Sequence, residues 1–390
     1  MTLLPSLVSS ALASTKLPLP KLNLDDCSSM SVAPIDFPTS DLDAKIVKRA
    51  RLHQFSGVVL VKQGDQSLFK SAYGEANRSW NIANQTTTRF RLASISKMFT
   101  AVGILQLIDQ GKLALETPVM DCLSLEETAI SEEVTIAHLL TMTAGIADWF
   151  TESDSWEEDW AKLCRDHPIY NFRQNQDYLP LFIHTPAVAP VGQCYQYNNA
   201  AYILLGLVIE TLSGLSYFDY VRRNIFAKAG MEQSDFLALD GIYANVAQGY
   251  VPITDGKGAI AAWKTNVYST TPEAAADGGA SSTVEDLARF SYALRTGALL
   301  SKAQTAAFLT PKVLDKVDSE TGELWNYGYG NQFLLTPQNE VIRWGHTGEE
   351  DGVSCRFYHY LQQNVDVVIL ANQSWCAGEL AWDIHSLLVE

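Results

Sequence analysis

The sequence lacks the local signatures of several common enzyme classes. Its 390 residues contain no G-x-S-x-G elbow, no H-E-x-x-H zinc pair and no glycine-rich loop of the kind that cradles phosphate. Basic residues are also scarce, because 28 Lys and Arg stand against 44 Asp and Glu, for a net charge of −16. Nucleic acids and anionic membranes are bound through clustered basic side chains, so neither is expected as a partner. No metal or cofactor is expected either.

Long apolar runs and a complete targeting signal are missing as well. No run reaches the roughly 18 apolar residues that a membrane span needs. Residues 1–15 are apolar and small, but no Lys or Arg precedes them, so the basic region of a signal peptide is absent. This favours a cytoplasmic protein, with secretion or a periplasmic location as the alternative. Three N-x-S/T sites, at Asn77, Asn84 and Asn372, would matter only after secretion.

The cysteines do not form a recognisable framework. Six are present, scattered through the chain without the paired spacing of a zinc site. In a chain of this size such a distribution predicts free thiols rather than structural disulfides.

Hydrophobic periodicity predicts strands at both ends of the chain and helices between them. Strand patterns occur at 55–62, 67–73, 328–335, 341–345, 353–361 and 365–371. Helical patterns occur at 41–53, 136–142, 201–212, 217–229, 283–295, 302–309 and 380–388, and after Ser94. The prediction is an α+β fold: an antiparallel sheet of about five strands, built from both termini and flanked by helices, with an inserted, mostly helical subdomain.

This pattern divides the chain into a leader and one large domain. Residues 1–40 are expected to be loosely structured, and 41–390 to form the domain. Its α/β part would comprise 41–93 and 283–390, and its helical part 94–282. A cleft is expected at the junction of the two parts.

The stretch 91–100 carries the first candidate chemistry, at the first crossing into the helical part. It places Ser94 where an extended segment turns into a helix, and Gly111 closes that helix as a C-cap would. Positions i and i+3 share a helix face, so the Lys97 amine can reach the Ser94 hydroxyl. Serine is a poor nucleophile without a neighbouring base, and a lysine can be that base when burial lowers its pKa. A serine–lysine nucleophile pair is therefore predicted.

Two further motifs follow in the sequence. Tyr197-Asn198-Asn199 precedes a predicted helix, and the G-H-T-G run at 345–348 ends a predicted strand. A second S-x-x-K, at 67–70, lies within a predicted strand, where positions i and i+3 face opposite sides. That copy is therefore a decoy.

The three motifs, in this order, resemble those of the serine β-lactamase and penicillin-binding-protein family: S-x-x-K, Y-x-N, and K-T-G or H-T-G. The form with tyrosine is similar to class C β-lactamases, D,D-peptidases, D-aminopeptidases and related esterases. Similarity extends to 55–59, 139–145 and 278–288, and covers the chain from about residue 41 to its end. The resemblance implies a beta-lactamase/transpeptidase-like fold.

The resemblance also implies catalytic roles. Ser94 would be the acylated nucleophile, with the base work shared between Lys97 and Tyr197, and either could take the proton. An ordinary tyrosine has a pKa near 10, so a phenolate role needs a nearby cation. Lys97 and a protonated His346 are the two candidates for that cation.

Substrate-binding roles follow from the same resemblance. Asn199 would hydrogen-bond the amide of the substrate. Thr347, Gly348 and Glu349 would line the substrate, with the backbone N–H groups of Ser94 and Glu349 as the oxyanion hole. His346 stands where many relatives have lysine, which makes the site less permanently cationic near neutral pH.

Glu349 departs from the family pattern. Relatives that bind a free carboxylate often carry Thr or Ser at this position. A carboxylate there would repel a β-lactam or a D-Ala-D-Ala terminus, and would tolerate or attract an amine. The sequence therefore predicts weak carboxypeptidase and β-lactamase activities.

A second unusual feature is the segment 148–160, where tryptophans alternate with acids. Two interpretations are equally supported: a wall or lid over the cleft, or a solvated helix whose tryptophans pack inward.

Together these features predict a metal-free serine enzyme that works through an acyl-enzyme on an amide or ester bond. The preferred substrates are small peptides or esters, including those with D-amino acids, rather than β-lactams. The alternatives are an acyltransferase or peptide cyclase with the same site, and a non-catalytic scaffold.

Overall fold

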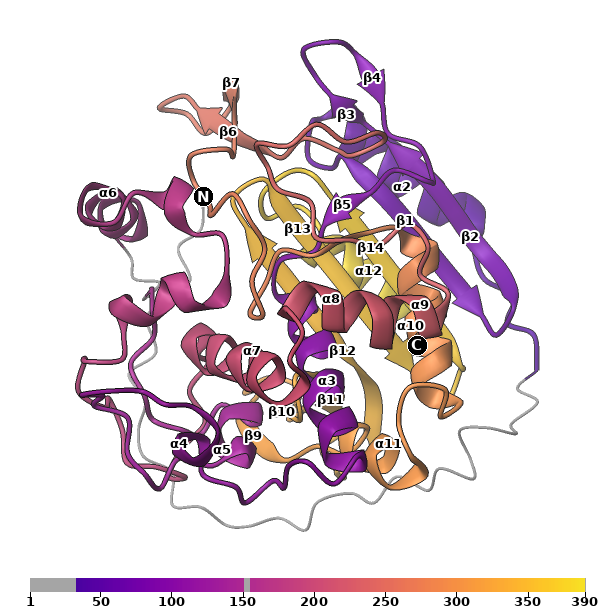
Figure 1. Ribbon diagram of the computed structural model, residues 1–390. Helices are drawn as coiled ribbons and strands as arrows, with labels where there is room; N and C mark the ends of the chain where they lie inside the picture. Colours follow the sequence, from indigo (N-terminus) through magenta and orange to yellow (C-terminus); the bar gives the residue numbers. More distant parts are fainter. Residues whose placement is uncertain (1–32, 151–154, 390) are drawn as a thin grey trace.

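The computed structural model describes residues 33–150 and 155–389 (Figure 1). Its centre is an eight-stranded antiparallel sheet with the strand order β2-β1-β14-β13-β12-β11-β10-β9. The N-terminal strands β1 (Gly57–Gln63) and β2 (Gln66–Tyr73) join the sheet through β14 (Val365–Ala371). The two ends of the chain thus build one sheet, which confirms the predicted α+β class.

The sheet is wider than the five strands expected. The other strands are β9 (Val313–Val317), β10 (Leu324–Tyr327), β11 (Gln332–Leu335), β12 (Val341–Glu350) and β13 (Val353–Tyr360). Strands β9 and β10 were not predicted. The strand expected at 328–335 begins only at Gln332, because Gly328 and Asn331 close a turn with Gly330 at a φ of 72°.

Two helical layers cover the sheet. Helices α2 (Thr39–Arg51) and α12 (Gly378–Val389) pack on one face, in a core cluster that includes Leu42, Ile46, Val59, Val61, Ile369, Leu380 and Ile384. On the other face lie α3 (Lys97–Asp109) and α10 (Val284–Arg295), within the larger core cluster. That cluster joins both predicted parts of the domain, since it contains Val58 and Phe357 from the sheet and Tyr202 from the helical part.

The middle of the chain is mainly helical. Its helices are α4 (Val119–Cys122), α5 (Ile136–Leu140), α6 (Trp156–Asp166), α7 (Asn199–Ser213), α8 (Tyr217–Val221) and α9 (Ala227–Ala229). The single helix expected at 217–229 is interrupted by a π-helical turn at Arg222–Phe226. Helix α11 (Lys302–Phe308) follows α10.

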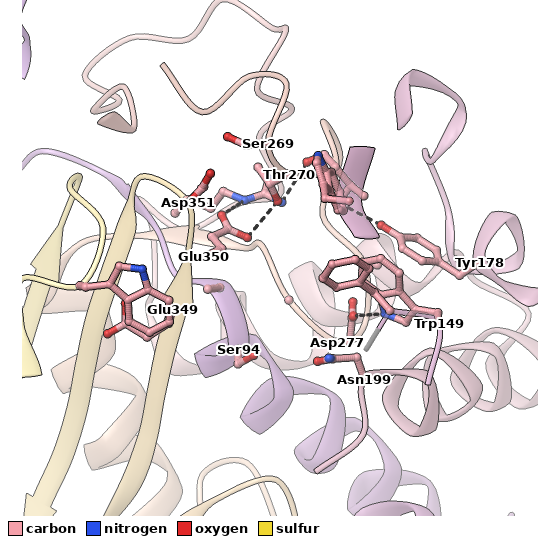
Figure 2. Close-up of a pocket in the computed structure, with 18 residues that line it drawn as sticks. Ser94, Trp149, Tyr178, Asn199, Ser269, Thr270, Asp277, Glu349, Glu350 and Asp351 are labelled. Atoms are coloured by element: carbon pink, nitrogen blue, oxygen red, sulfur yellow. Dashed lines mark hydrogen bonds and ion pairs between the residues drawn. The ribbon is translucent and has the colours of Figure 1, made fainter. Parts of the chain in front are cut away.

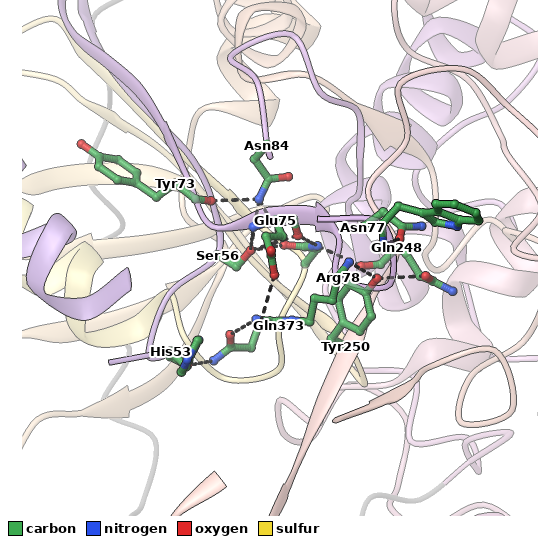
Figure 3. Close-up of polar contacts among 12 residues, drawn as sticks. His53, Ser56, Tyr73, Glu75, Asn77, Arg78, Asn84, Gln248, Tyr250 and Gln373 are labelled. Carbon is green, nitrogen blue, oxygen red and sulfur yellow. Dashed lines mark hydrogen bonds and ion pairs between the residues drawn. The ribbon is translucent and has the colours of Figure 1, made fainter. Parts of the chain in front are cut away.

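The middle also contains an unpredicted hairpin of β6 (Tyr250–Thr254) and β7 (Ile260–Thr265). Arg78 anchors it: Tyr250 OH accepts from the Arg78 N–H at 2.7 Å (Figure 3). The Arg78 guanidinium also stacks on Trp263 at 3.8 Å. Shorter ladders pair β3 (Glu75–Asn77) with β4 (Ile82–Ala83), and β5 (Phe90–Arg91) with β8 (Ser281–Ser282).

Several expectations about accessibility can be compared with the fold. The predicted leader lies largely outside the described residues, as does Cys27; the five cysteines that are described are free. Asn84 and Asn372 are buried, and both hydrogen-bond Ser56 Oγ, so neither could carry a sugar in this fold (Figure 3). In the described part of the chain, no single helix is long and apolar enough to cross a membrane. Only α7 and 217–229 meet that test jointly, and they are bent by 76°.

Candidate active site

Ser94 lies in a short 3-10 turn, Ala93–Ser96, that continues directly into α3. Ala93 has a φ of 47°, which is unusual for a residue with a side chain. The turn is held from both sides: Ser96 Oγ donates to Ala93 O at 2.8 Å, and the Gly279 N–H donates to the same oxygen at 3.2 Å. The nucleophile candidate is thus fixed at the start of a buried helix, in the first turn as expected.

Lys97 is fully buried and directed at Ser94. Its amine has three hydrogen-bond acceptors: Ser94 Oγ at 3.0 Å, Asn199 Oδ1 at 2.7 Å and the main-chain oxygen of Asp277 at 2.6 Å. An ammonium has three N–H donors, so all of them are used. The i, i+3 contact expected from the sequence is therefore present, and Asn199 contacts the lysine.

Tyr197 reaches the same place from the loop before α7. The centre of its ring is 4.9 Å from Lys97 Nζ and 6.3 Å from the His346 ring. With 36% of its surface exposed, the side chain also faces solvent. The tyrosine ring and the serine hydroxyl are thus both neighbours of the Lys97 amine, although Tyr197 is far from the other two in the sequence.

His346 is fully buried, and both of its ring nitrogens have hydrogen-bond partners. Its Nδ1 lies 2.5 Å from Thr347 O, and its Nε2 lies 3.2 Å from Tyr327 OH. A carbonyl can only accept, so we assign the proton to Nδ1, and Nε2 then accepts from the tyrosine. Burial lowers the pKa of His346 to about 3. A neutral His346 leaves Lys97 as the candidate for the cation beside Tyr197, with Lys97 Nζ 4.9 Å from the centre of the tyrosine ring.

Strand β12 brings its backbone beside the serine. The G-H-T-G run lies inside this strand and does not end it, because pairing with β13 continues to Glu350. At Gly348 the strand passes so close to the Ser94 turn that a Cβ would lie 2.1 Å from Leu92 O. Glu349, the next residue, lines the same pocket as Ser94. The role of its N–H in an oxyanion hole stays a prediction.

The charge of Glu349 is compensated in a way that the sequence did not show. Arg356, from β13, pairs with its carboxylate at 2.5 Å, and Ser354 Oγ donates to it at 2.8 Å. Burial raises the pKa of Glu349, and Arg356 opposes that rise. Glu350 is paired likewise, with Arg91 at 2.5 Å. The repulsion of carboxylate substrates expected from a bare Glu349 is therefore reduced.

A pocket of about 340 Å³ opens above Ser94. Figure 2 shows Ser94 between the acids at the end of β12 and, on the opposite side, Trp149 and Tyr178. Phe150 and Trp160 extend this aromatic wall, with ring centres 5.5 Å apart. Of the two interpretations of 148–160, the wall holds for Trp149, Phe150 and Trp160, which line the pocket. Residues 151–154 lie outside the described part of the chain.

Sequence reasoning missed two acids beside this wall, the partly buried Asp148 and the buried Asp277. Asp148 accepts hydrogen bonds from the backbone N–H groups of Asn199 and Ala200, and Asp277 accepts from Trp149 Nε1. Burial raises the pKa of Asp148 to about 6 and also raises that of Asp277, whose rise is opposed by Lys97. No local pattern marks either residue. Among the described residues, no group of three or more His, Cys, Asp or Glu is arranged to hold a metal.

Comparison with known proteins places this geometry in a family. The family model described as Beta-lactamase matches residues 42–377. The chain belongs to the beta-lactamase family. This beta-lactamase-family serine hydrolase is 29% identical over 336 residues to a penicillin-binding protein of Bacillus subtilis (strain 168), across 82% of this chain and 69% of the relative. It is also 27% identical to esterase EstB of Burkholderia gladioli, across 78% and 84% of the two chains.

Solved structures agree with the assignment. The penicillin-binding protein from Bacillus halodurans superposes with a TM-score of 0.78 and 38% identity, covering 88% of this chain and 99% of that one. The D-amino acid amidase from Ochrobactrum anthropi SV3, at 18% identity and a TM-score of 0.69 over 90% and 96% of the chains, shares the fold. The predicted beta-lactamase/transpeptidase-like architecture is thereby confirmed.

Proposed function

We propose that this protein hydrolyses an amide or ester bond of a small, peptide-like substrate through an acyl-enzyme on Ser94. The contact between Lys97 Nζ and Ser94 Oγ carries this proposal, because it places a buried amine 3.0 Å from the attacking oxygen. Such a distance permits direct proton transfer from the hydroxyl.

The other two partners of Lys97 determine the direction of that transfer. Asn199 Oδ1 and the main-chain oxygen of Asp277 can only accept, so each holds one N–H in either protonation state of the amine. Only the contact with Ser94 can reverse, with the neutral amine accepting the serine proton. The proton that Lys97 gains and loses is thus confined to the line towards the nucleophile.

Tyr197 would carry the proton onward to the leaving group. Its ring lies over the Lys97 amine and its side chain is partly exposed to solvent. Because its ring lies beside the amine, Tyr197 could equally be the first base. Both assignments use the same pair of residues, and His346 supports them as a neutral group.

The acyl group would be held at β12. The N–H groups of Ser94 and Glu349 would stabilise the oxyanion. Because Gly348 has no side chain, β12 can lie close to Leu92, beside the Ser94 turn. Water then attacks the acyl-enzyme and regenerates the serine.

The pocket supports small substrates with an apolar or aromatic group, since Trp149, Phe150 and Trp160 form its wall. Peptides with D-amino acids and small esters fit this description, and the relatives named penicillin-binding protein and esterase are consistent with both. Weak β-lactam hydrolysis remains the prediction, now with less support from charge because Arg356 neutralises Glu349.

A fluorophosphonate probe tests the proposal. The probe should label the wild-type protein and fail to label Ser94→Ala. Hydrolysis of small esters and D-peptides should vanish in the same variant. Equal labelling of both proteins would remove Ser94 as the nucleophile, and a complete lack of labelling would favour the non-catalytic scaffold.

The aromatic wall gives one reason to keep acyl transfer as a second candidate, because it could bind an amine or alcohol with an apolar body. Adding such amines during turnover separates the two. Diversion of most of the acyl group to the amine would identify a transferase, whereas unchanged release of the acid would identify a hydrolase.

A further inference from the structure

Asp148 holds the start of α7, where Asn199 is the first residue. Its carboxylate is partly buried and accepts the backbone N–H groups of Asn199 at 2.8 Å, Ala200 at 2.9 Å and Trp149 at 2.8 Å. The Asn199 side-chain Nδ2 lies 3.3 Å from the same carboxylate. Asp148 therefore fixes both the backbone and the amide group of the residue whose Oδ1 contacts Lys97.

Trp149, the next residue, holds the other side of Lys97. Its indole Nε1 donates to Asp277 Oδ2 at 2.9 Å. The main-chain oxygen of Asp277 is the second fixed acceptor of the Lys97 amine, at 2.6 Å. Figure 2 shows Trp149, Asp277 and Asn199 grouped on the same side of Ser94.

We propose that Asp148 and Trp149 are positioning residues for Lys97, each holding one of the two acceptors that direct its amine towards Ser94. This inference rests on the proposed function, because it concerns the base of that reaction. Two neighbours in sequence thus control two acceptors that belong to separate segments, α7 and the loop before β8.

The physical reason lies in the tetrahedral geometry of the amine. With two N–H groups fixed on Asn199 and Asp277, the remaining position can only face the serine. If either acceptor shifts, the amine can rotate about its flexible stem and the proton path is lost. Misplacement of a catalytic group by about 1 Å can cost on the order of a hundredfold in rate.

One substitution tests each of the two positioning residues. Trp149→Phe removes the indole N–H but keeps an aromatic ring in the pocket wall. Asp148→Asn keeps the shape and one acceptor oxygen but replaces the other with a donor. For both variants we expect kcat for an ester substrate to fall by about tenfold to a hundredfold, with KM changed by less than about threefold. The rate of Ser94 labelling by a fluorophosphonate should fall in parallel.

Matched controls come from residues of the same kind that lie elsewhere. Asp109, at the far end of α3, accepts the Ser301 N–H at the start of α11, and Trp325 packs on Trp382 in a different part of the fold. Asp109→Asn and Trp325→Phe should leave kcat and the labelling rate within about twofold of wild type. Because Asp148→Asn and Trp149→Phe act on the same amine, the fold-loss of kcat in the double variant should be smaller than the product of the two single losses.

Three results would overturn the inference: a rise in KM at constant kcat, losses no larger than those of the controls, or independent effects in the double variant. If Asp148→Asn fails to fold, Trp149→Phe alone decides the outcome. A wild-type protein that the probe does not label would refute the proposed function. Labelling at one rate in wild type and both variants would refute only the positioning role.

Discussion

The residue that determines the chemistry of this site is Lys97, a fully buried amine whose hydrogen-bond acceptors are a hydroxyl, an amide and a main-chain carbonyl. None of these acceptors is a carboxylate. The amine is therefore held by geometry, and Ser94 is the one acceptor that is also a donor. A lowered pKa alone would not give a lysine this function, since desolvation also lowers the pKa of the half-buried Lys312, to about 8.

Replacing Lys97 with methionine should show that the S-x-x-K motif at 94–97, and not the second one at 67–70, is catalytic. Lys97→Met keeps the apolar stem but removes the amine, so we expect the acylation rate of Ser94 to fall by about 10²- to 10⁴-fold. Lys70→Met in β2 is the control, because Lys70 belongs to the second S-x-x-K and pairs with Glu285 near the surface. Labelling rates with a fluorophosphonate measure both. Comparable losses in the two variants would contradict the assignment.

The pH dependence should follow Asp148 and not His346. The pKa of Asp148 is raised to about 6 by burial, with neighbouring Asp277 adding to the rise, so its accepting carboxylate form is lost as the pH falls through about 6. His346, with a pKa lowered to about 3, stays neutral over that range. We therefore expect kcat to decline below about pH 6 in the wild type. His346→Gln should leave the pH midpoint of this decline unchanged, whereas Asp148→Asn should abolish the decline. The reverse pattern would contradict the role of Asp148.

At the scale of elements, the site depends on how closely β12 approaches the Ser94 turn. Only a glycine fits at position 348, since any side chain would meet the Leu92 carbonyl. The strand also carries two acids next to the site, each neutralised by an arginine from β13 or β5. The strand can therefore run on past the motif without an unpaired charge.

Gly348→Ala should move the strand away from the serine. Its Cβ would lie 2.1 Å from Leu92 O, so the Glu349 N–H should leave the oxyanion position and kcat should fall by about 10²- to 10³-fold. Gly256→Ala, in open space between β6 and β7, controls for the loss of a glycine. Steady-state kinetics at saturating substrate distinguish the two variants. Activity within about twofold of wild type in Gly348→Ala would show that Glu349 contributes no N–H.

Elements with strong local signals could be predicted from the sequence. Helix α3 ends at Asp109, and the expected Gly111 follows with a φ of 69°. Helix α10 lies within the expected range 283–295, and Thr283 Oγ1 accepts the Asp286 N–H at its start. Strand β9 could not be predicted, because four of its five residues are exposed and show no alternation. Its place comes from pairing with β10.

The site was predictable where it depends on short spacing. Ser94 and Lys97 meet because they are three residues apart on a helical turn. Arg356 as the partner of Glu349 depends on the pairing register of β12 and β13, and Asp148 contacts α7 only after long-range folding. Neither contact leaves a mark on the local sequence.

At the scale of the whole molecule, the sheet separates the site from a second core. The reaction centre lies with α3 and α7 in the larger cluster, whereas α2 and α12 pack on the opposite face. Helices α2 and α12 therefore stabilise the sheet from the face opposite the reaction centre.

Leu380→Ala in α12 tests this separation. The side chain is fully buried in the second cluster, so its loss should lower the free energy of unfolding by about 2–5 kcal/mol. Glu379→Ala removes a surface partner of Arg49 and should cost about 0–1 kcal/mol. Urea denaturation measures both, and kcat at 25 °C should stay unchanged. Loss of kcat in folded Leu380→Ala would show that the two cores are coupled.

The most direct test of the account is the mass of the reaction intermediate. Wild-type protein should be quenched in acid during turnover of a small ester or a D-peptide, digested, and compared with Ser94→Ala and Tyr197→Phe. We expect one acyl group on the peptide that contains Ser94. The group should be absent from Ser94→Ala and should form much more slowly in Tyr197→Phe. Turnover without a covalent adduct, or an acyl group on another residue, would contradict it.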